Sequence, residues 1–418
     1  MRNKKRILVL GLSSIAVFSM VAASALFLTS GGAKAASRSN ANAGTGISPQ
    51  QVMSSAHAHH LGGVISAQAT TVRGAQTNSS ASAPPFDGTP PLLFHGSAGA
   101  ASCSFTPCDN GNVLMTESTG PLVVVPIYWD PSESISASYR DIINDYLGNV
   151  AKDSGHNNNV FSVSNEYYGN NGQIRYHIKL GDVITDTNPI TSGCTVDSAD
   201  TTGVYPDGSG YSACVDDAQL QAEIDNVTAA NSLPHDLSHI YVVYLPKGVE
   251  SCFNSGSTTS TAGGQACTIN HQPTAAYCAY HSTDNNNAVY ANMPYPTYHS
   301  PQSTVRFTCG SDARVAGFGQ IESPNGNPDA DVEISPTSHE IAESITDPDV
   351  QTGWYDSSGF ENGDECAYIY GPTQGTAGAL YNQVIHGGHY LTQEEFSNNL
   401  YIFSGGTSGC IQGTRANR

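Results

Sequence analysis

The feature that most limits what this chain can fold into is a continuous apolar run, PLVVVPIYWD, at residues 121–130. The run has the length of one strand, is rich in valine and does not alternate between apolar and polar residues. A strand of this kind is typically buried on both faces. The sequence therefore predicts a sheet whose two sides are both covered.

Periodic patterns further along the chain predict the elements around this strand. Apolar residues recur at steps of three and four between positions 134 and 152, which predicts a helix. A second, short helix fits residues 216–229, where Asp216 and Gln219 have the spacing of a capping box. The segments 174–180 and 240–245 predict a half-buried and a buried strand, and an edge strand is expected near Tyr290.

This order of elements predicts one globular domain at residues 100–418, of the α+β class. Helices would pack against a mixed, twisted sheet, and the last helix, which contains His339, would lie beneath that sheet. No internal repeat is present. Long glycine-rich loops bury little apolar surface, so disulfides or bound ions are expected to hold them.

The amino terminus has the pattern of an export signal. MRNKKR precedes an uncharged stretch at residues 7–29, and Ala33-Lys34-Ala35 then offers small residues at both cleavage subsites. Residues 1–35 are therefore expected to be a signal peptide of a secreted protein, although the stretch is long enough to remain as an uncleaved anchor. Residues 36–99 are rich in Ala, Ser, Gly and Thr, which predicts a flexible linker or pro-segment.

Ten cysteines follow the predicted signal, and an even number in an exported chain indicates disulfides. No CxxC pair occurs, which argues against a zinc ion bound by cysteines. The connectivity cannot be read from the sequence, but pairing of near neighbours would clamp loops that have few apolar residues. These near-neighbour pairs are Cys103 with Cys108, Cys194 with Cys214, and Cys252 with Cys267.

The net charge excludes two classes of partner. The charge is −20, and it becomes −25 when the five basic residues of the first 35 are removed. Nucleic acid and anionic membrane surfaces are therefore poor partners. Charged residues make up only 12% of the chain, so the surface resembles that of an exported enzyme rather than a disordered acidic tail.

The strongest chemical signal is SPTSHEIAESITDPD, at residues 335–349. Ser335 is a good N-cap and Pro336 suits the first position of a helix. Pro348 cannot continue a helix, and the residue before a proline avoids helical angles. A helix of about ten residues is therefore expected to end near Thr346.

This helix would carry a metal site. His339 and Glu343 lie four residues apart on one face, where both can bind one ion. Glu340 lies about 100° further round, where it could take a proton from a water on that ion. Carboxylate is an accepted zinc ligand, and it also makes Ca²⁺ or Mn²⁺ more plausible than a second histidine would. The competing interpretation is an amphipathic surface helix with solvated glutamates.

A third ligand must come from further along the chain. Asp349 follows His339 by ten residues, the interval of the third metzincin ligand, but the glycine and the Met-turn of that arrangement are missing. The other source is the acidic loop WYDSSGFENGDEC at residues 354–366. Within it, Glu361 or Asp364 is favoured.

Eight short blocks occur in the same order as in a known family. They run from VVVPIYWDP through SNEYYGNNGQI, IYVVYLPKGVESC, YCAYHS, SHEIAESITDP, WYD and ENGDEC to YNQVIHGGHYLTQEEFSNN. The chain thereby resembles the secreted phosphate-induced, or EXORDIUM-like, family and its bacterial relatives. The resemblance implies an extracellular or wall-associated protein with a zincin-like domain. It favours Glu361 and Asp364 over Asp349 as ligands, and it implies that His281 is structural or lies at the edge of the site.

Two functions of different classes follow. The first is a secreted metal-dependent hydrolase, a zinc metallopeptidase acting on an extracellular peptide. In it His339, Glu343 and an acid from the loop containing Glu361 and Asp364 hold Zn²⁺, and Glu340 is the catalytic base. The second is a non-catalytic protein that binds a cell-wall polymer or polysaccharide and holds a structural Ca²⁺. No GxSxG or GxGxxG element indicates a serine hydrolase or a nucleotide cofactor.

Overall fold

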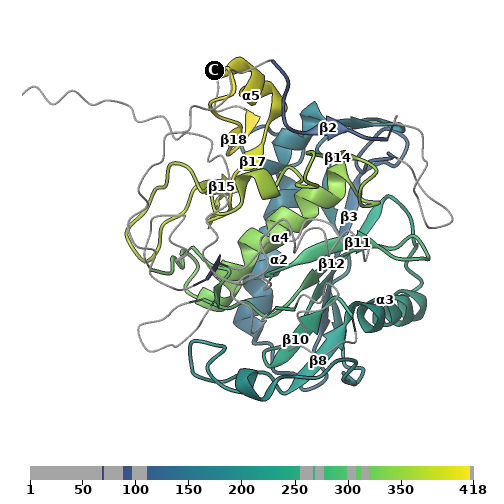
Figure 1. Ribbon diagram of the computed structural model, residues 1–418, viewed down its shortest axis with the longest axis vertical. Coiled ribbons are helices and arrows are strands. Elements are labelled where there is room, and N and C mark those ends of the chain that lie inside the picture. The colour runs from purple at the N-terminus through teal and green to yellow at the C-terminus, as the bar shows by residue number, and fades with distance from the viewer. Residues whose placement is uncertain are drawn as a thin grey trace, which may run out of the picture.

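A mixed sheet of six strands stands at the centre of the fold (Figure 1). The computed structural model describes residues 68–69, 88–96, 111–254, 267–268, 277–298, 307–311 and 320–414. The sheet contains β3 (Leu122–Trp129), β6 (Ile178–Leu180), β7 (Ile184–Asp186), β9 (His239–Tyr244), β11 (Tyr280–Thr283) and β12 (Val289–Met293). Its order is β11-β12-β9-β3-β6, and β7 also pairs with β3. All neighbours are parallel except β11, which runs antiparallel to β12.

The other described elements are helices and short strand pairs. The α-helices are α2 (Ala137–Lys152), α3 (Asp217–Asn231), α4 (Pro328–Thr346) and α5 (Asn398–Phe403), and the 3₁₀ helices are η1 (Val160–Glu166), η2 (Ser198–Asp200) and η3 (Asp364–Cys366). The strand pairs are β1 (Gln68–Ala69) with β13 (Phe307–Thr308), β2 (Leu93–Phe94) with β14 (Trp354–Tyr355), β4 (Tyr168–Gly169) with β5 (Gly172–Gln173), β8 (Ala213–Asp216) with β10 (Val249–Cys252), β15 (Gln383–Ile385) with β16 (Gly388–Tyr390), and β17 (Glu395–Phe396) with β18 (Cys410–Ile411).

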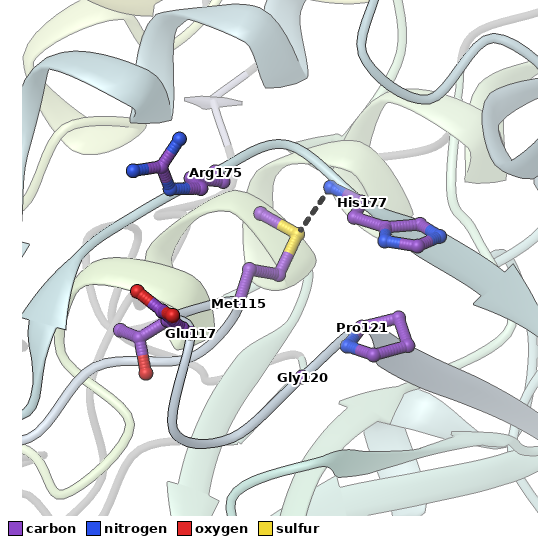
Figure 2. Close-up of a pocket in the computed structure, with 7 residues that line it drawn as sticks. Met115, Glu117, Gly120, Pro121, Arg175 and His177 are labelled. Carbon is purple, nitrogen blue, oxygen red and sulfur yellow. Dashed lines mark hydrogen bonds between the residues drawn. The ribbon is translucent and has the colours of Figure 1, made fainter.

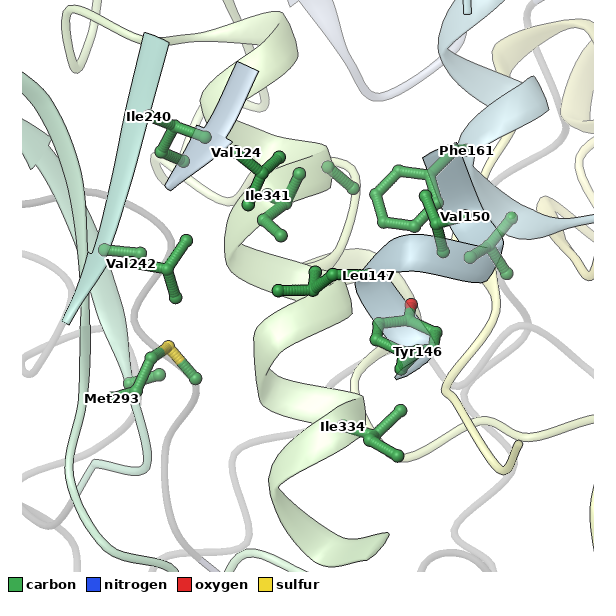
Figure 3. Close-up of a cluster of buried hydrophobic side chains, with 14 of the residues drawn as sticks. Val124, Tyr146, Leu147, Val150, Phe161, Ile240, Val242, Met293, Ile334 and Ile341 are labelled. Atoms are coloured by element: carbon green, nitrogen blue, oxygen red, sulfur yellow. The ribbon is translucent and has the colours of Figure 1, made fainter. Parts of the chain in front are cut away.

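The apolar run forms β3 and is buried on both faces, as the sequence predicts. Val124 and Tyr128 face a core shared with α2 and α4, whereas Val125 and Ile127 face a second core shared with α3. Figure 3 shows the first core, where Ile341 of α4 lies among side chains of the sheet and of α2. The predicted mixed sheet with packed helices is therefore confirmed.

Two predicted helices are found close to their expected bounds. The helix expected at residues 216–229 is α3, and the capping box of Asp216 with Gln219 is present. The helix expected between 134 and 152 is α2, which begins after the N-cap Ser136 and ends at Lys152. In both cases the apolar face that gave the prediction is the face that packs against the sheet.

The prediction for the start of α4 is wrong. The helix begins at Pro328, after the N-cap Asn327, and Pro336 lies inside it rather than at its first position. Asn327 and Pro328 supply an earlier start of the same chemical kind as Ser335 and Pro336. The predicted end at Thr346 is correct. Every residue of α4 from position 330 onward is buried, so surrounding contacts stabilise the helix despite its internal proline.

The predicted edge strand is also placed differently. The strand near Tyr290 is β12, which lies between β11 and β9, and the edge of the sheet is β11. The short, polar sequence of β11 gave no strand signal. In the segment predicted as a half-buried strand, Ile174, Tyr176 and Ile178 are buried as expected, but only Ile178–Leu180 pairs with the sheet.

Four disulfides lie among the described residues, a state consistent with an extracellular protein. The predicted pairs Cys194–Cys214 and Cys252–Cys267 are confirmed. The other two pairs, Cys278–Cys309 and Cys366–Cys410, span longer separations of 31 and 44 residues. The predicted Cys103–Cys108 pair and the predicted signal lie outside the described residues. None of the described helices is long and apolar enough to cross a membrane.

Asp217 is the first residue of α3, and its side chain links this helix to the sheet by hydrogen bonds. Its Oδ1 accepts hydrogen bonds from the hydroxyls of Tyr280 (2.9 Å) and Tyr290 (2.7 Å), and its Oδ2 accepts one from Gln221 (2.7 Å). Burial raises the pKa of Asp217 to about 6, although these hydrogen bonds oppose the rise.

The pH dependence of stability should reveal this carboxyl. Because its pKa is higher in the folded chain, the folded state binds more protons than the unfolded state between about pH 4 and pH 6. The stability that Asp217 contributes is therefore present below about pH 4 and is lost as the pH rises through about 6. We therefore compare Asp217→Asn with wild type as the pH rises from about 4 to about 7. Over this range the unfolding free energy of the variant should rise by about 3 kcal/mol relative to that of wild type. Urea unfolding of both proteins measures this; a difference that stays constant with pH contradicts the assignment.

Candidate metal centre

The helix α4 brings three of the predicted site residues into the interior. His339, Glu340 and Glu343 have no exposed surface. His339 Nε2 lies 2.9 Å from Glu343 Oε2, as expected for side chains one turn apart on the same face. The interpretation of this segment as a solvated surface helix is therefore wrong.

The acidic loop reaches the same place. The backbone N–H of Asp364 donates to Glu343 Oε1 (2.8 Å), and Asp364 Oδ1 lies 3.8 Å from His339 Nε2. Asp364 Oδ2 also accepts from the backbone N–H of Glu361 (3.1 Å), so the loop is folded around this carboxylate. The structure thus brings together all five residues that the sequence analysis placed in the site.

His281 lies in the middle of this cluster rather than at its edge. It comes from β11, and its ring is fully buried. Its Nδ1 is 3.3 Å from Glu340 Oε2 and 3.9 Å from Glu343 Oε2, and its Nε2 is 3.7 Å from Glu361 Oε2. The family resemblance implied only a structural or edge role for His281, because the block YCAYHS does not show which distant residues this histidine will contact.

The geometry suits a metal ion. One group of potential ligand atoms comes from His339, Glu340 and Glu343, and another comes from His281, Glu343 and Glu361, with atoms within 4.8 Å of one another in each group. Ligands that bind one Zn²⁺ at about 2.0–2.2 Å lie roughly 3–4 Å apart. Asp349 and Asp364 belong to neither group. Asp364 Oδ1 nevertheless lies 3.8 Å from His339 Nε2, whereas the backbone carbonyl oxygen of Asp349 accepts a hydrogen bond from Thr352 (2.6 Å).

The buried carboxyls of the centre resist ionisation. Burial raises the pKa of Glu340 well above its usual value, and the charges of Glu343, Asp364 and Glu395 raise it further. Burial likewise raises the pKa of Glu361, with a further contribution from Asp347 first among its neighbours. A divalent cation at the centre would favour the ionised forms, so its binding would release protons.

Glu340 is oriented from one side only. Its Oε2 faces His281 Nδ1, whereas its Oε1 is buried without a hydrogen-bond partner in the described part of the chain. The other ring nitrogen of His281, Nε2, lies 3.1 Å from the carbonyl oxygen of Asp347. Glu340 therefore has one oxygen held in place and one oxygen available to a small molecule such as water.

Hydrogen bonds from other segments hold the acidic loop (residues 354–366) in place. Thr346 Oγ1 at the end of α4 donates to Asn362 Oδ1 (3.0 Å), and Asn362 Nδ2 donates to Glu395 Oε2 (3.1 Å). Gln393 Nε2 donates to the carbonyl oxygen of Gly363 (2.7 Å). Such supporting groups orient metal ligands. They lie on segments far apart in the sequence, so spacing alone could not identify them.

Gly363 leaves room for the ligands, because a Cβ on this residue would lie 2.7 Å from His339 Nδ1 and 2.9 Å from Glu343 Oε1. We expect Gly363→Ala to weaken metal binding about 10–100-fold, the range typical of changes to groups that support ligands. Gly148→Ala is the matched control, since its Cβ would make only an ordinary contact, 3.7 Å from Leu180. Isothermal titration of the metal-free proteins with Zn²⁺ measures both; equal affinity in Gly363→Ala and wild type would contradict the placement of Gly363.

A cavity of about 460 Å³ is formed by other residues (Figure 2). Its lining consists of Met115, Thr116, Glu117, Gly120, Pro121, Arg175 and His177. No candidate metal ligand lines this cavity. It is therefore not the place where a substrate would meet the buried histidines and acids.

No protein-family model, curated protein or solved structure matches this chain.

Proposed function

We propose that this protein is an exported zinc-dependent hydrolase of the zincin type that cleaves extracellular peptides. The proposal rests on one observation. His339, Glu343 and Asp364 lie close together beside Glu340 in the protein interior. The ordered blocks that resemble the EXORDIUM-like family and the disulfides support an extracellular, zincin-like setting.

The proposed ligands are His339 through Nε2, Glu343 through Oε2 and Asp364 through Oδ1. A bound zinc ion would make a water molecule acidic and polarise the carbonyl group to be cleaved. Asp364 also fixes Glu343 through its backbone N–H, so that both carboxylates are positioned together. The second imidazole, His281, lies 3.9 Å from Glu343 Oε2 through its Nδ1 and 3.7 Å from Glu361 Oε2 through its Nε2.

Glu340 is the proposed general base. Its free oxygen, Oε1, would accept the proton of the attacking water, and Glu340 would then deliver this proton to the amine that leaves. His281 holds the other oxygen and so fixes the direction in which the carboxylate acts. Glu340 transfers the proton and His281 orients it, so these two steps need no further side chain.

The proposal is tested on the purified full-length protein. Zinc analysis should find at least one equivalent bound, and a mixed peptide library should be cleaved by the protein as isolated and not after treatment with 1,10-phenanthroline. Protein without any bound transition metal, or cleavage that the chelator does not affect, would show the proposal to be wrong.

A structural metal site is the second candidate, and the complete burial of the ligand side chains favours it. His281, His339 and Glu343 have no exposed surface, and Glu361 and Asp364 are 1% and 2% exposed. The protein would then be a binding protein for a wall polymer whose metal only stabilises the fold. Bound metal together with no cleavage of any peptide in the library would favour this function.

A further inference from the structure

Asp225, His235 and Asp284 form a further group of potential metal ligands, and it shares no residue with the groups at α4. One ligand atom of each residue lies within 4.8 Å of the other two. Asp225 lies on α3, His235 lies in the loop between α3 and β9, and Asp284 follows β11 at the turn before β12. The group therefore joins three segments that are distant in sequence, and α3 packs on the face of the sheet opposite α4.

Each of the two carboxylates has one oxygen that is held in place and one that is left over. Asn286 Nδ2 donates to Asp225 Oδ2 (2.8 Å), and the backbone N–H groups of Asn286 and Ala288 donate to Asp284 Oδ1 (2.8 Å each). The other two oxygens, Asp225 Oδ1 and Asp284 Oδ2, are buried and have no hydrogen-bond partner in the described part of the chain. Asp284 as a whole is only 6% exposed. A buried oxygen without a partner calls for a bound ion or water.

The hydrogen bonds around His235 leave its Nδ1 available as a ligand. Thr228 Oγ1 donates its single hydrogen to the carbonyl oxygens of Ile224 (2.7 Å) and Asp225 (3.1 Å). It must therefore accept a hydrogen from His235 Nε2, which lies 2.7 Å away. The neutral ring then carries its proton on Nε2 and a lone pair on Nδ1. A hydrogen bond of this kind on one ring nitrogen sets which nitrogen binds a metal.

The distance between His235 and Asp225 suits a shared cation better than a direct hydrogen bond. His235 Nδ1 lies 3.9 Å from Asp225 Oδ1, which is beyond hydrogen-bond range but within the roughly 3–4 Å that separates two ligands of one Zn²⁺. By contrast, His156 Nδ1 lies 2.8 Å from Asp153 Oδ1, as in a direct hydrogen bond. One imidazole nitrogen and two carboxylate oxygens are accepted zinc ligands.

We infer that Asp225, His235 and Asp284 bind a Zn²⁺ ion of their own, through Oδ1, Nδ1 and Oδ2 respectively. Three protein ligands leave the fourth position of tetrahedral zinc to water. Solvent reaches this position, because the side chains of His235 and Asp225 are 21% and 40% exposed. The site should therefore bind zinc more weakly than the buried centre at α4 and lose its ion during purification. When filled, it joins the loop before β9 and the turn after β11 to α3.

Zinc binding to the full-length protein is the test. Metal-free protein is titrated with Zn²⁺ in equilibrium dialysis, and wild type should bind one equivalent more than His235→Ala. Asp284→Asn should bind that equivalent about tenfold or more weakly, because Asn can still accept the two backbone N–H groups of the turn but presents an NH₂ group to the ion. His156→Ala is the matched control: it removes a histidine that contacts a single carboxylate, and it should bind as much zinc as wild type.

Equal zinc binding by wild type and His235→Ala overturns the inference. Circular dichroism checks that His235→Ala is folded. If it is not, Asp225→Asn decides, because this side chain is partly exposed and its replacement need not disturb the fold; zinc binding equal to that of wild type would then exclude the site. His339→Ala separates this result from the hydrolase proposal. It should keep the equivalent assigned to His235, and a His339→Ala protein that binds no zinc would show that the second site does not exist.

Discussion

Replacing Glu340 by Gln should lower peptide cleavage about 10²–10⁴-fold, the usual contribution of a general base, while the zinc content stays the same. Gln has nearly the same shape as Glu but cannot accept the proton of the attacking water. Its side chain can still contact His281, so the ligands on α4 should keep their positions. The cleavage rate and the zinc content of both proteins are measured on the same preparations.

Glu333→Gln is the matched control for this experiment. Glu333 lies on the same helix and is 1% exposed, but it is not a member of either group of potential metal ligands. Its replacement should leave cleavage unchanged. If Glu340→Gln and Glu333→Gln cleave peptides equally fast, Glu340 is not the base, and the structural role of the metal becomes the better explanation.

Removal of the metal should lower the melting temperature by about 10 °C or more. Without a cation, the charges of Glu340, Glu343, Glu361 and Asp364 repel one another in the interior or must be neutralised by protons. Loss of a buried charge partner typically costs about 3–5 kcal/mol, and one kcal/mol shifts the melting temperature of a domain of this size by about 2–4 °C. Calorimetry with and without 1,10-phenanthroline, which binds transition metals and leaves Ca²⁺ in place, measures the change.

His339→Ala serves as the control for this second prediction. This variant should already lack the metal, so the chelator should not lower its melting temperature further. Adding Zn²⁺ back should restore wild type and not the variant. An unchanged melting temperature of wild type in the chelator would contradict the presence of a stabilising transition metal at α4.

The sequence predicted the elements whose side chains repeat with a clear period. The unbroken apolar run identified β3, and the steps of three and four identified α2 and α3 together with their caps. The edge strand β11 could not be predicted, because its four residues, YHST, contain neither an apolar run nor a clear alternation of apolar and polar residues. The start of α4 was misplaced because Ser335 and Pro336 have cap chemistry that packing overrides.

The site could be predicted only as far as local spacing reaches. His339, Glu340 and Glu343 follow from helical geometry, and the density of acids indicated Glu361 and Asp364. His281 takes its place through the pairing of β11 with β12, and Glu395 takes its place through a contact with Asn362. Both depend on tertiary structure, which no spacing within one segment reveals.

The distances along the chain between the residues of the centre have a consequence for folding kinetics. His281 and Glu340 are 59 positions apart, and Glu343 and Asp364 are 21 apart. Contacts between distant positions form late, because long loops must close first. A nascent or refolding chain would therefore lack a high-affinity pocket until its last step, and bound metal should slow unfolding far more than it accelerates refolding.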